Sequence, residues 1–332
     1  MVPSASKIHW RYLSEEKRFP LVCQAETGGD GVDAAAWISA EREEILSRLQ
    51  EHGAILFRGF SNIDVMQFEK IIRLLSGELL EYRERSSPRS QIEGNIYTST
   101  DYPPHQPIYL HNENSYSHSF AKKIFFYCQT ASQTGGETPI ADVRKVYSHI
   151  PEVIRNRFRE KGVRYVRNFS DNIGLTWKTV FQTEDREQVE QYCQSAGYSW
   201  EWKKDGGLRV ARSSRASARH PHTGEPIWFN HATFFHITTF DEKLRKALQQ
   251  IYSEEDLPNN TYYGDGSPIE DSTLEALRLA YAKETVKFAW QEGDILMLDN
   301  LMAAHAREPF TGARKVLVGM SEMTNWDELP EI

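Results

Sequence analysis

The sequence has few cysteines and no long hydrophobic run, and each shortage excludes a class of protein. Only three cysteines occur in 332 residues (Cys23, Cys128 and Cys193), and none belongs to a C-x-x-C pair. An odd number of widely spaced cysteines predicts reduced thiols in a cytoplasmic protein rather than a disulfide framework. No apolar stretch approaches the ~20 residues of a membrane-spanning helix, and the polar N-terminus is not typical of a secretory signal.

Positive charge is also scarce. The chain has 39 Lys and Arg residues against 47 Asp and Glu residues, so its formal net charge is −8. Because affinity for nucleic acids depends mainly on cationic side chains that neutralise phosphates, this balance argues against a general nucleic-acid partner. Aromatic residues, by contrast, make up 12% of the chain, which indicates a substantial core and an aromatic-lined pocket.

Repeats, low-complexity segments and long flexible linkers are absent from the sequence, which predicts a single domain over 1–332. Within it we expect a core at about 53–323, an N-terminal extension at 1–40 and a basic insertion at about 203–222. Apolar residues recur with helical spacing in five segments: 41–52, 64–75, 142–161 (broken at Pro151), 241–252 and 272–283. No residue pattern indicates an oligomeric state.

Short apolar runs typical of strands lie between these helices. They cover 54–57, 108–110, 124–129, 163–166, 226–230, 285–290, 294–298 and 315–321. The helices do not alternate regularly with these runs, as a Rossmann fold would require. We therefore predict a mainly β fold with flanking helices: an antiparallel sandwich or jelly roll with helical insertions.

One short segment, Tyr-Leu-His-Asn-Glu at 109–113, carries residue types of a metal site. On a strand, His111 and Glu113 would project to the same face. A second segment, 292–305, is predicted to form a buried strand followed by a turn that ends at His305. Two histidines and one carboxylate form the facial triad of non-haem Fe(II), which leaves coordination positions open. The alternative for His111 is a structural histidine hydrogen-bonded to a neighbouring strand.

Three motifs together resemble the TauD/TfdA family of Fe(II)- and 2-oxoglutarate-dependent dioxygenases. They are Leu-His-Asn-Glu at 110–113, Gly-Gly-Glu-Thr-Pro-Ile-Ala-Asp at 135–142 and His-Ala-Arg-Glu-Pro-Phe-Thr-Gly-Ala-Arg at 305–314. Segments 95–103 and 220–230 are similar to the branch that contains the syringomycin-pathway aspartate hydroxylase. Members of that branch modify amino acids, often on a peptidyl carrier protein. The resemblance implies a double-stranded β-helix (jelly-roll) core.

The resemblance implies roles for five residues. His111, Glu113 and His305 would be the catalytic iron ligands, and Arg314 with Thr138 would bind the distal carboxylate of 2-oxoglutarate. The family more often has aspartate where Glu113 stands, which indicates a subfamily rather than a different chemistry. A ferrous ion, one carboxylate and the 2-oxoglutarate dianion leave one negative charge, which an arginine fork would balance. Outside such a site, Arg314 would be expected to form a salt bridge at the edge of a strand.

The implied reaction consumes O2 and 2-oxoglutarate and releases succinate. Its substrate would be an unactivated C–H bond of an amino acid, or of a carrier-tethered aminoacyl group, in antibiotic biosynthesis. Related halogenases have Gly or Ala where Glu113 stands, so this carboxylate favours hydroxylation over halogen transfer. The alternatives are a desaturase or epoxidase with the same cofactors, a zinc hydrolase with the same three ligands, and a non-catalytic jelly-roll binding protein.

The segment 203–222 is basic, with six Lys or Arg residues against one Asp. It is either a solvated loop or a surface that docks an acidic carrier protein, with Arg212 and Arg215 as candidate contacts. His220 and His222 could form a metal pair, but their loop context favours a structural role. Arg307 is interpreted as half of a structural ion pair, with a substrate carboxylate as its alternative partner.

Overall fold

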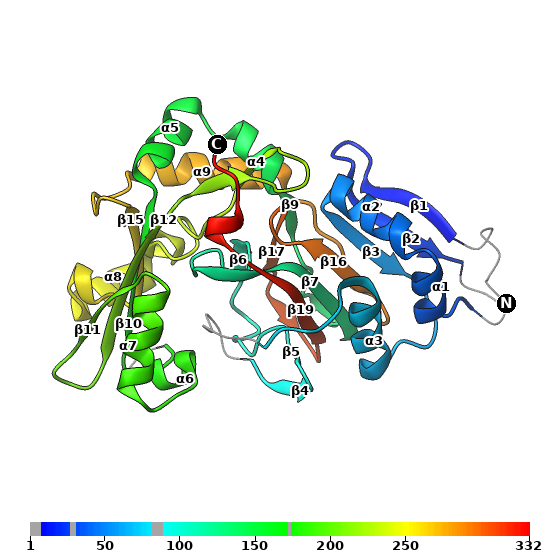
Figure 1. Cartoon of the computed structure of the whole chain (residues 1–332), viewed down its shortest axis with the longest axis horizontal. Coiled ribbons are helices and arrows are strands. Elements are labelled where there is room, and N and C mark those ends of the chain that lie inside the picture. Colours follow the sequence, from blue (N-terminus) through cyan, green and yellow to red (C-terminus); the bar gives the residue numbers. More distant parts are fainter. Residues whose placement is uncertain (1–7, 27–30, 82–88, 172–173) are drawn as a thin grey trace.

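An eight-stranded mixed sheet is the largest element of the computed structural model, which describes residues 8–26, 31–81, 89–171 and 174–332. Across this sheet (Figure 1) the strands are, in order, β1 (Ile8–Ser14), β2 (Phe19–Ala25), β3 (Ala54–Arg58), β16 (Ile295–Asp299), β7 (Ser119–Thr130), β19 (Lys315–Asn325), β5 (Ile96–Thr98) and β4 (Gln91–Glu93). Strands β3, β16, β7 and β19 pair antiparallel, whereas β2 and β3 pair in parallel.

A three-stranded sheet packs against the inner face of the large one. Its strands are β6 (Ile108–His111), β17 (Ala303–Arg307) and β9 (Ile140–Asp142). Side chains of both sheets meet in one buried cluster, which includes Ile124 and Leu296 from the large sheet and Ile140 from the small one. Two stacked sheets that share an apolar interior are typical of β-sandwiches, which include the jelly roll, so the predicted fold class is confirmed.

Three helices cover the outer face of the large sheet: α1 (Ala34–Ala40), α2 (Arg42–His52) and α3 (Val65–Ser76). Helix α2 ends at Gly53, whose φ of 75° is the left-handed conformation that terminates many helices. Helix α3 begins at Asp64, whose carboxylate accepts a hydrogen bond from the Gln67 amide. Phe68 and Leu49 are among the apolar residues that these helices bury against the sheet.

A second, four-stranded antiparallel sheet lies at the far end of the molecule from the N-terminal elements (Figure 1). It consists of β11 (Ser199–Trp202), β12 (Leu208–Ser214), β10 (Val163–Phe169) and β15 (Asn259–Tyr263). Burial alternates along β10, as expected of a strand with one face in the core. Helices α6 (Trp177–Phe181) and α7 (Arg186–Ser195) pack on this sheet.

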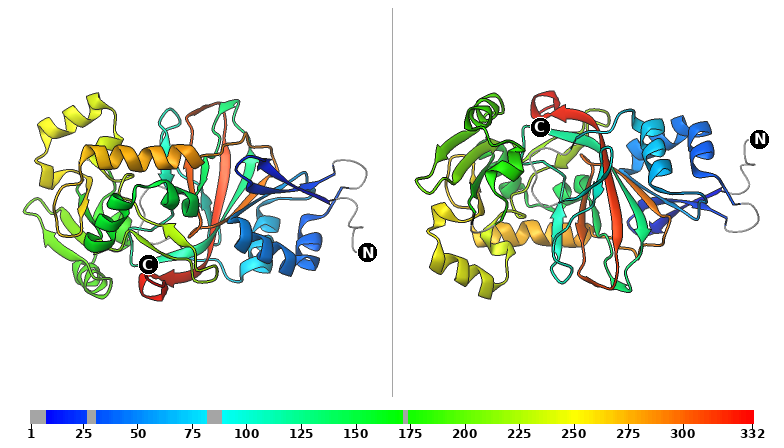
Figure 2. Two further views of the ribbon diagram at one scale, coloured as in Figure 1. Left: turned by 90° about the horizontal axis from the view of Figure 1, so that it is seen from above. Right: turned by 90° about the horizontal axis from the view of Figure 1, so that it is seen from below.

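The remaining elements connect the two parts. Helix α9 (Asp271–Glu284) runs along the long axis of the molecule (Figure 2) and contacts α4 (Val143–His149). The others are α5 (Glu152–Lys161), α8 (Glu242–Ile251), and the short strand pairs β13 (Ser217–Arg219) with β14 (Pro226–Trp228) and β8 (Thr134–Gly135) with β18 (Phe310–Thr311). Within the described part of the chain, none of the helices combines the length and apolar character needed to cross a bilayer.

Some local predictions were wrong. Segment 285–290 forms no strand, and only Val286 makes an isolated bridge, to Ile140. The first forty residues supply two strands of the large sheet that the sequence did not predict. Segment 203–222 is no separate loop, because half of it forms β12 and β13. Pro151, in contrast, does separate two helices as predicted, because it caps α5 just after α4 has ended.

Candidate active site

His111, Glu113 and His305 converge in the structure. One ligand atom from each residue lies within 4.8 Å of the others, and all three side chains are buried. His111 on β6 and His305 on β17 are direct partners across the antiparallel pair, and their ring centroids are 4.4 Å apart. Cross-strand partners project to the same face of a sheet, so strand pairing alone brings together two histidines that are far apart in the chain.

Glu113 reaches the triad in a different way from the one predicted. It lies in the turn after β6 rather than on the strand, and the fully buried Asn300 fixes its backbone. The Asn300 amide accepts a hydrogen bond from Glu113 N at 2.8 Å and donates to Glu113 O at 3.0 Å and Ala121 O at 2.8 Å. Asn112 in turn donates to Asn300 O at 2.6 Å. This side-chain network, not strand alternation, directs Glu113 toward the histidines.

His111 is held in the form that binds metals. Its Nδ1 lies 2.8 Å from Tyr109 O, so Nδ1–H donates and the lone pair of Nε2 remains for a ligand bond. Burial, with a smaller contribution from the neighbouring His305, lowers the pKa of His111 to about 3, although Glu113 acts in the opposite direction. The imidazole is therefore neutral around pH 7.

Glu113 is ionised in spite of its burial. Burial alone would raise its pKa, but Arg89 and the two histidines outweigh burial and hold the pKa of Glu113 well below its usual range. Arg89 Nη2 lies 2.8 Å from Glu113 Oε2 in a pair that is buried on both sides.

Two buried polar atoms of the triad are suited to binding a metal. Glu113 Oε1 and His305 Nδ1 have no hydrogen-bond partner among the described residues. Buried polar atoms are rarely left unpaired in folded proteins. A divalent metal suits an ionised carboxylate and neutral imidazoles, so the donor set fits the facial triad of non-haem iron.

The two histidines of the triad line a cavity of about 830 Å³, whose wall also includes Thr138 and Arg314. Arg314 Nε donates to Gly136 O at 3.0 Å, and its guanidinium lies over the Phe310 ring at 5.5 Å from the centroid. Burial and the neighbouring Arg307 lower the pKa of Arg314 to about 10, so it still carries its charge at neutral pH. The sequence-predicted arginine therefore faces the same space as the two histidines.

Thr138 is oriented by an indole. Trp290 Nε1 donates to Thr138 Oγ1 at 2.9 Å, in a contact buried from solvent. Because that bond uses a lone pair of the hydroxyl, the hydroxyl hydrogen remains available to donate into the cavity. An anion at this position would accept from Thr138 and pair with Arg314.

The weaker candidates have structural roles. Arg307 pairs with no carboxylate among the described residues, and its guanidinium instead donates to three backbone carbonyls of 102–106, at 2.9, 2.7 and 2.7 Å. His220 Nε2 lies 3.1 Å from Asp299 Oδ2, and its Nδ1 accepts from Thr223 N, which agrees with the structural role favoured for this histidine.

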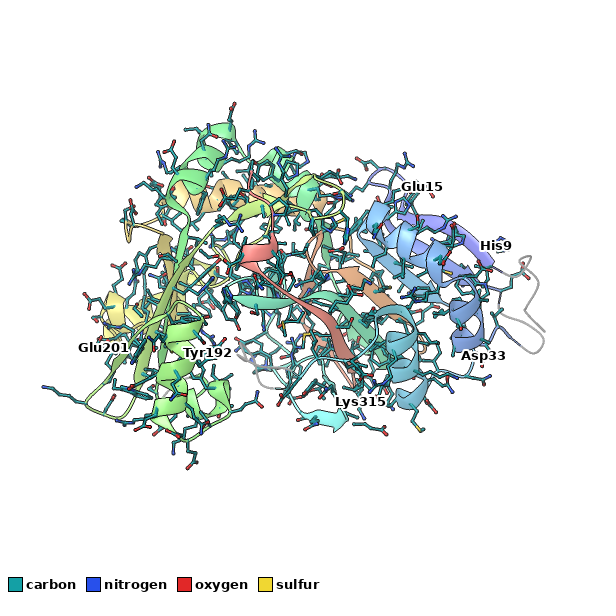
Figure 3. All side chains as sticks on the ribbon, viewed as in Figure 1. His9, Glu15, Asp33, Tyr192, Glu201 and Lys315 are labelled. Carbon is teal, nitrogen blue, oxygen red and sulfur yellow. The ribbon has the colours of Figure 1, made fainter. Side chains whose placement is uncertain are left out.

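The interpretation of 203–222 as a solvated loop is wrong, and so is the choice of Arg212 as a docking residue. Arg212 is only 8% exposed and donates through Nε to Ala196 O at 3.1 Å. Arg215 donates to Trp326 O and Leu329 O. Other cations of the segment pair with acids; Arg209, for example, pairs with Glu201, which Figure 3 labels on the four-stranded sheet.

Two residues near the triad, Arg89 and Asn300, were missed by the sequence analysis. His231, whose sequence context is typical of a pocket or core histidine, is buried there as well: its ring centroid is 5.5 Å from that of His111 and its Nδ1 lies 2.6 Å from Ser115 Oγ. A polar pair directly after an apolar strand could have drawn attention to Asn300, which follows Asp299. Nothing in the polar segment around Arg89 distinguishes it from its neighbours.

A jelly-roll core that presents two histidines and a carboxylate to an internal cavity defines the class of this protein as a non-haem iron oxygenase. The model of the taurine catabolism dioxygenase TauD, TfdA family matches residues 15–321. The chain therefore belongs to that family, as its motifs predicted, and it is an oxygenase that uses iron and 2-oxoglutarate.

Relatives and solved structures agree with this assignment. The chain is 41% identical to dapdiamide synthesis protein DdaC of Enterobacter agglomerans over 278 residues, and the aligned region covers 84% of each chain. It is 30% identical to the clavaminate synthase-like protein At3g21360 of Arabidopsis thaliana, over 92% of this chain and 94% of the relative. The fold is similar to PvcB of Pseudomonas aeruginosa (TM-score 0.56, 15% identity, 100% and 97% coverage) and to AAD-2 (TM-score 0.54, 14% identity, 98% and 99% coverage).

Proposed function

We propose that this oxygenase hydroxylates a C–H bond of an amino acid or aminoacyl group in the biosynthesis of an amino-acid-derived antibiotic. The observation that carries the proposal is the convergence of the triad with Arg314 and Thr138 on one cavity. The similarity to a dapdiamide synthesis protein over 84% of the chain supports the biosynthetic setting. We place the reaction in the cytoplasm, because all three cysteines are buried and none forms a disulfide.

In this proposal each residue has a defined task. His111, Glu113 and His305 hold the iron, which activates O2 together with 2-oxoglutarate when both are bound. Arg314 pairs with the distal carboxylate of 2-oxoglutarate, and Thr138 donates its hydroxyl hydrogen to the same group. Phe126, which contacts His305 with a centroid distance of 5.1 Å, excludes water from this side of the centre.

The test measures succinate formation with Fe(II), 2-oxoglutarate and air, in the presence of a panel of amino acids and their pantetheine thioesters. We expect succinate to form with the wild-type protein, to increase with the true substrate, and to be absent with His111→Ala. The product should gain one oxygen by mass spectrometry. Loss of two hydrogens would instead indicate a desaturase, and an epoxide would be recognised by a gain of one oxygen at an existing double bond. Turnover without O2 or 2-oxoglutarate would overturn the proposal in favour of a hydrolase.

A carrier-bound substrate remains part of the proposal, although not through the basic segment first considered for it. Arg212 and Arg215 are committed to backbone carbonyls within the fold. Comparing free amino acids with their thioesters in the same assay decides whether the tethered form is preferred.

A further inference from the structure

The cavity is larger than the molecules that the proposed function requires. Its volume is about 830 Å³. Even if each non-hydrogen atom takes the roughly 30 Å³ of a water molecule in the liquid, 2-oxoglutarate and a small amino acid such as aspartate together fill only about 570 Å³. Roughly a third of the cavity is therefore available to a further part of the substrate.

The outer wall of the cavity, formed by residues 234–248, is mainly apolar. The apolar side chains of this wall that line the cavity are Phe234, Phe235, Phe240, Leu244 and Leu248. The ring centroid of Phe234 lies 4.6 Å from that of His111 and 5.5 Å from that of Phe235. The outer wall therefore begins beside the triad and extends away from it, so a substrate that reaches the metal also contacts this wall.

Helix α8 and the turn before it expose apolar side chains to the cavity. Leu244, Leu248 and Ile251 recur with the spacing of one helical face. Leu248 is buried, whereas Leu244 is 40% exposed, and Phe240 in the preceding turn is 37% exposed. Because Leu244 and Phe240 line the cavity, an apolar group that covers them leaves water together with them, which favours binding.

Several polar side chains near this wall are already engaged within the fold. The carboxylate of Asp241 caps α8 by accepting from an amide of its first turn at 2.9 Å. Asn168 donates to the carbonyls of residues 255 and 257 at 2.9 and 2.7 Å, and Thr239 donates to Thr233 O. The Arg167 guanidinium lies over two phenylalanine rings, 4.9 and 5.6 Å from their centroids. Polar groups that are already bonded add little to the binding of a polar ligand, so this wall selects mainly by apolar contact.

We propose that the outer wall binds an apolar group of the substrate, and that the substrate is an amino acid or aminoacyl group extended by an apolar chain or ring. This inference rests on the proposed function and names its substrate class. Phe240 and Leu244 are then specificity-determining residues. The apolar group belongs either to the amino-acid side chain or to an acyl group on the amino nitrogen, and the test distinguishes these two sources.

The test varies the length of an apolar chain. Protein loaded with Mn(II) and 2-oxoglutarate is titrated calorimetrically with two series of compounds. One series contains L-amino acids with unbranched side chains from ethyl to hexyl, and the other contains L-alanine with N-acyl groups from acetyl to hexanoyl. In one series, each added methylene should tighten binding by about three- to fourfold until the space beside the outer wall is filled. The series that shows this gain identifies where the apolar group is attached.

Variants of α8 and the turn before it test whether the outer wall causes the gain. In the double variant Phe240→Ser/Leu244→Ser, the gain per methylene should fall to about 1.5-fold or less, because two apolar contacts are lost. Leu244→Met keeps an apolar side chain and should retain most of the gain. The matched control is Ile251→Ser, because Ile251 lies on the same face of α8 and is 72% exposed but does not line the cavity. This control should leave the gain unchanged.

Other outcomes overturn the inference. Binding that is independent of chain length in both series would show that the cavity takes no apolar group. A gain that persists in the double variant, or that falls equally in Ile251→Ser, would place the apolar group away from the outer wall. Tighter binding of the pantetheine thioester of L-alanine, without any effect of chain length, would assign the space to the arm of a carrier protein.

Failure of this inference is distinguishable from failure of the proposed function. A wild-type protein that binds Mn(II) and 2-oxoglutarate but shows no gain with chain length contradicts only the inference. A wild-type protein that neither binds Mn(II) nor forms succinate contradicts the proposed function itself.

Discussion

Two walls of the cavity are built on different principles. The triad wall, formed by β6, β17 and the turn after β6, is fixed by backbone pairing between His111 and His305 and by the hydrogen bonds of Asn300. The outer wall, formed by residues 234–248, is fixed largely by contacts between rings, such as Phe234 with Phe235 at 5.5 Å. Backbone register positions a side chain closely, whereas ring packing mainly defines a shape.

Because of this difference, the two walls suit two different tasks: one binds the metal and the other selects the substrate. A metal centre requires three donor atoms at short, fixed distances, and only a hydrogen-bonded scaffold provides them. A substrate wall tolerates changes of volume, because neighbouring rings can repack around them. We therefore expect substitutions on the triad wall to abolish the chemistry, and those on the outer wall to change which substrate is accepted.

The two walls should differ most in metal affinity when one side chain of the triad is removed. His111→Ala should weaken Mn(II) binding by at least about 10³-fold and abolish succinate formation, because two remaining donors hold a divalent ion poorly. Phe234→Leu, which changes the outer wall next to the same histidine, should bind Mn(II) within about threefold of wild type. Titrations followed by electron paramagnetic resonance measure both. Similar affinities for the two variants would show that the walls do not differ as described.

Asn300→Ala should have the next largest effect. It removes three hydrogen bonds in a fully buried position and should lower the free energy of unfolding by about 2–4 kcal/mol. Mn(II) affinity should fall by about 10- to 100-fold as Glu113 loses its support. The matched control is Thr261→Val, which removes a buried hydroxyl bonded to Ala232 O on the outer-wall side. Urea unfolding and Mn(II) titration should show that the control loses stability without losing metal affinity.

The sequence predicted the triad wall better than the outer wall. His111, Glu113 and His305 belong to short motifs whose residue types have a specific chemistry, so their convergence could be predicted without knowing the path of the chain. The jelly-roll class also followed from many short apolar runs. Asn300 and Arg89 were not recognised, because a buried clamp and a buried cation are defined by three-dimensional contacts that no local pattern encodes.

The errors have a common physical cause. The six cations of 203–222 looked like a solvated surface, yet Arg212 and Arg215 are used within the fold as donors to backbone carbonyls. Linear charge density does not reveal whether a guanidinium faces solvent or a carbonyl. Similarly, Glu113 was placed on a strand, but the chain turns after His111, and Asn114 adopts a positive φ of 55°. Turn geometry of this kind depends on tertiary hydrogen bonds.

Arg314→Lys tests the 2-oxoglutarate end of the cavity. Lysine keeps the charge but cannot form the bidentate contact, so the dissociation constant for 2-oxoglutarate should rise by about 10- to 50-fold. Mn(II) binding in the absence of 2-oxoglutarate should remain unchanged, because Arg314 does not contact the triad ligands. Calorimetry of the Mn(II)-loaded protein gives both values. An unchanged 2-oxoglutarate affinity would remove Arg314 from the proposed site.

The last expected effect, which leaves the chemistry untouched, is a pH dependence of stability at the outer wall. His236 begins the turn that leads from the aromatic residues to α8, and its Nδ1 accepts from Thr238 N. Burial lowers the pKa of His236 to about 4, with Arg278 and Arg245 acting in the same direction and Asp271 opposing them.

Because the folded pKa is depressed, the folded state binds fewer protons than the unfolded state between pH 6.5 and about 4. The stability linked to this histidine is therefore complete above pH 6.5 and is lost as the pH falls toward 4, by roughly 3 kcal/mol at most. His236→Asn preserves a capping acceptor but does not titrate. Urea unfolding at several pH values measures the free energy of unfolding of both proteins. Below pH 6.5 the wild type should lose stability relative to the variant. A difference that stays constant with pH would show that acid does not act on the outer wall through His236.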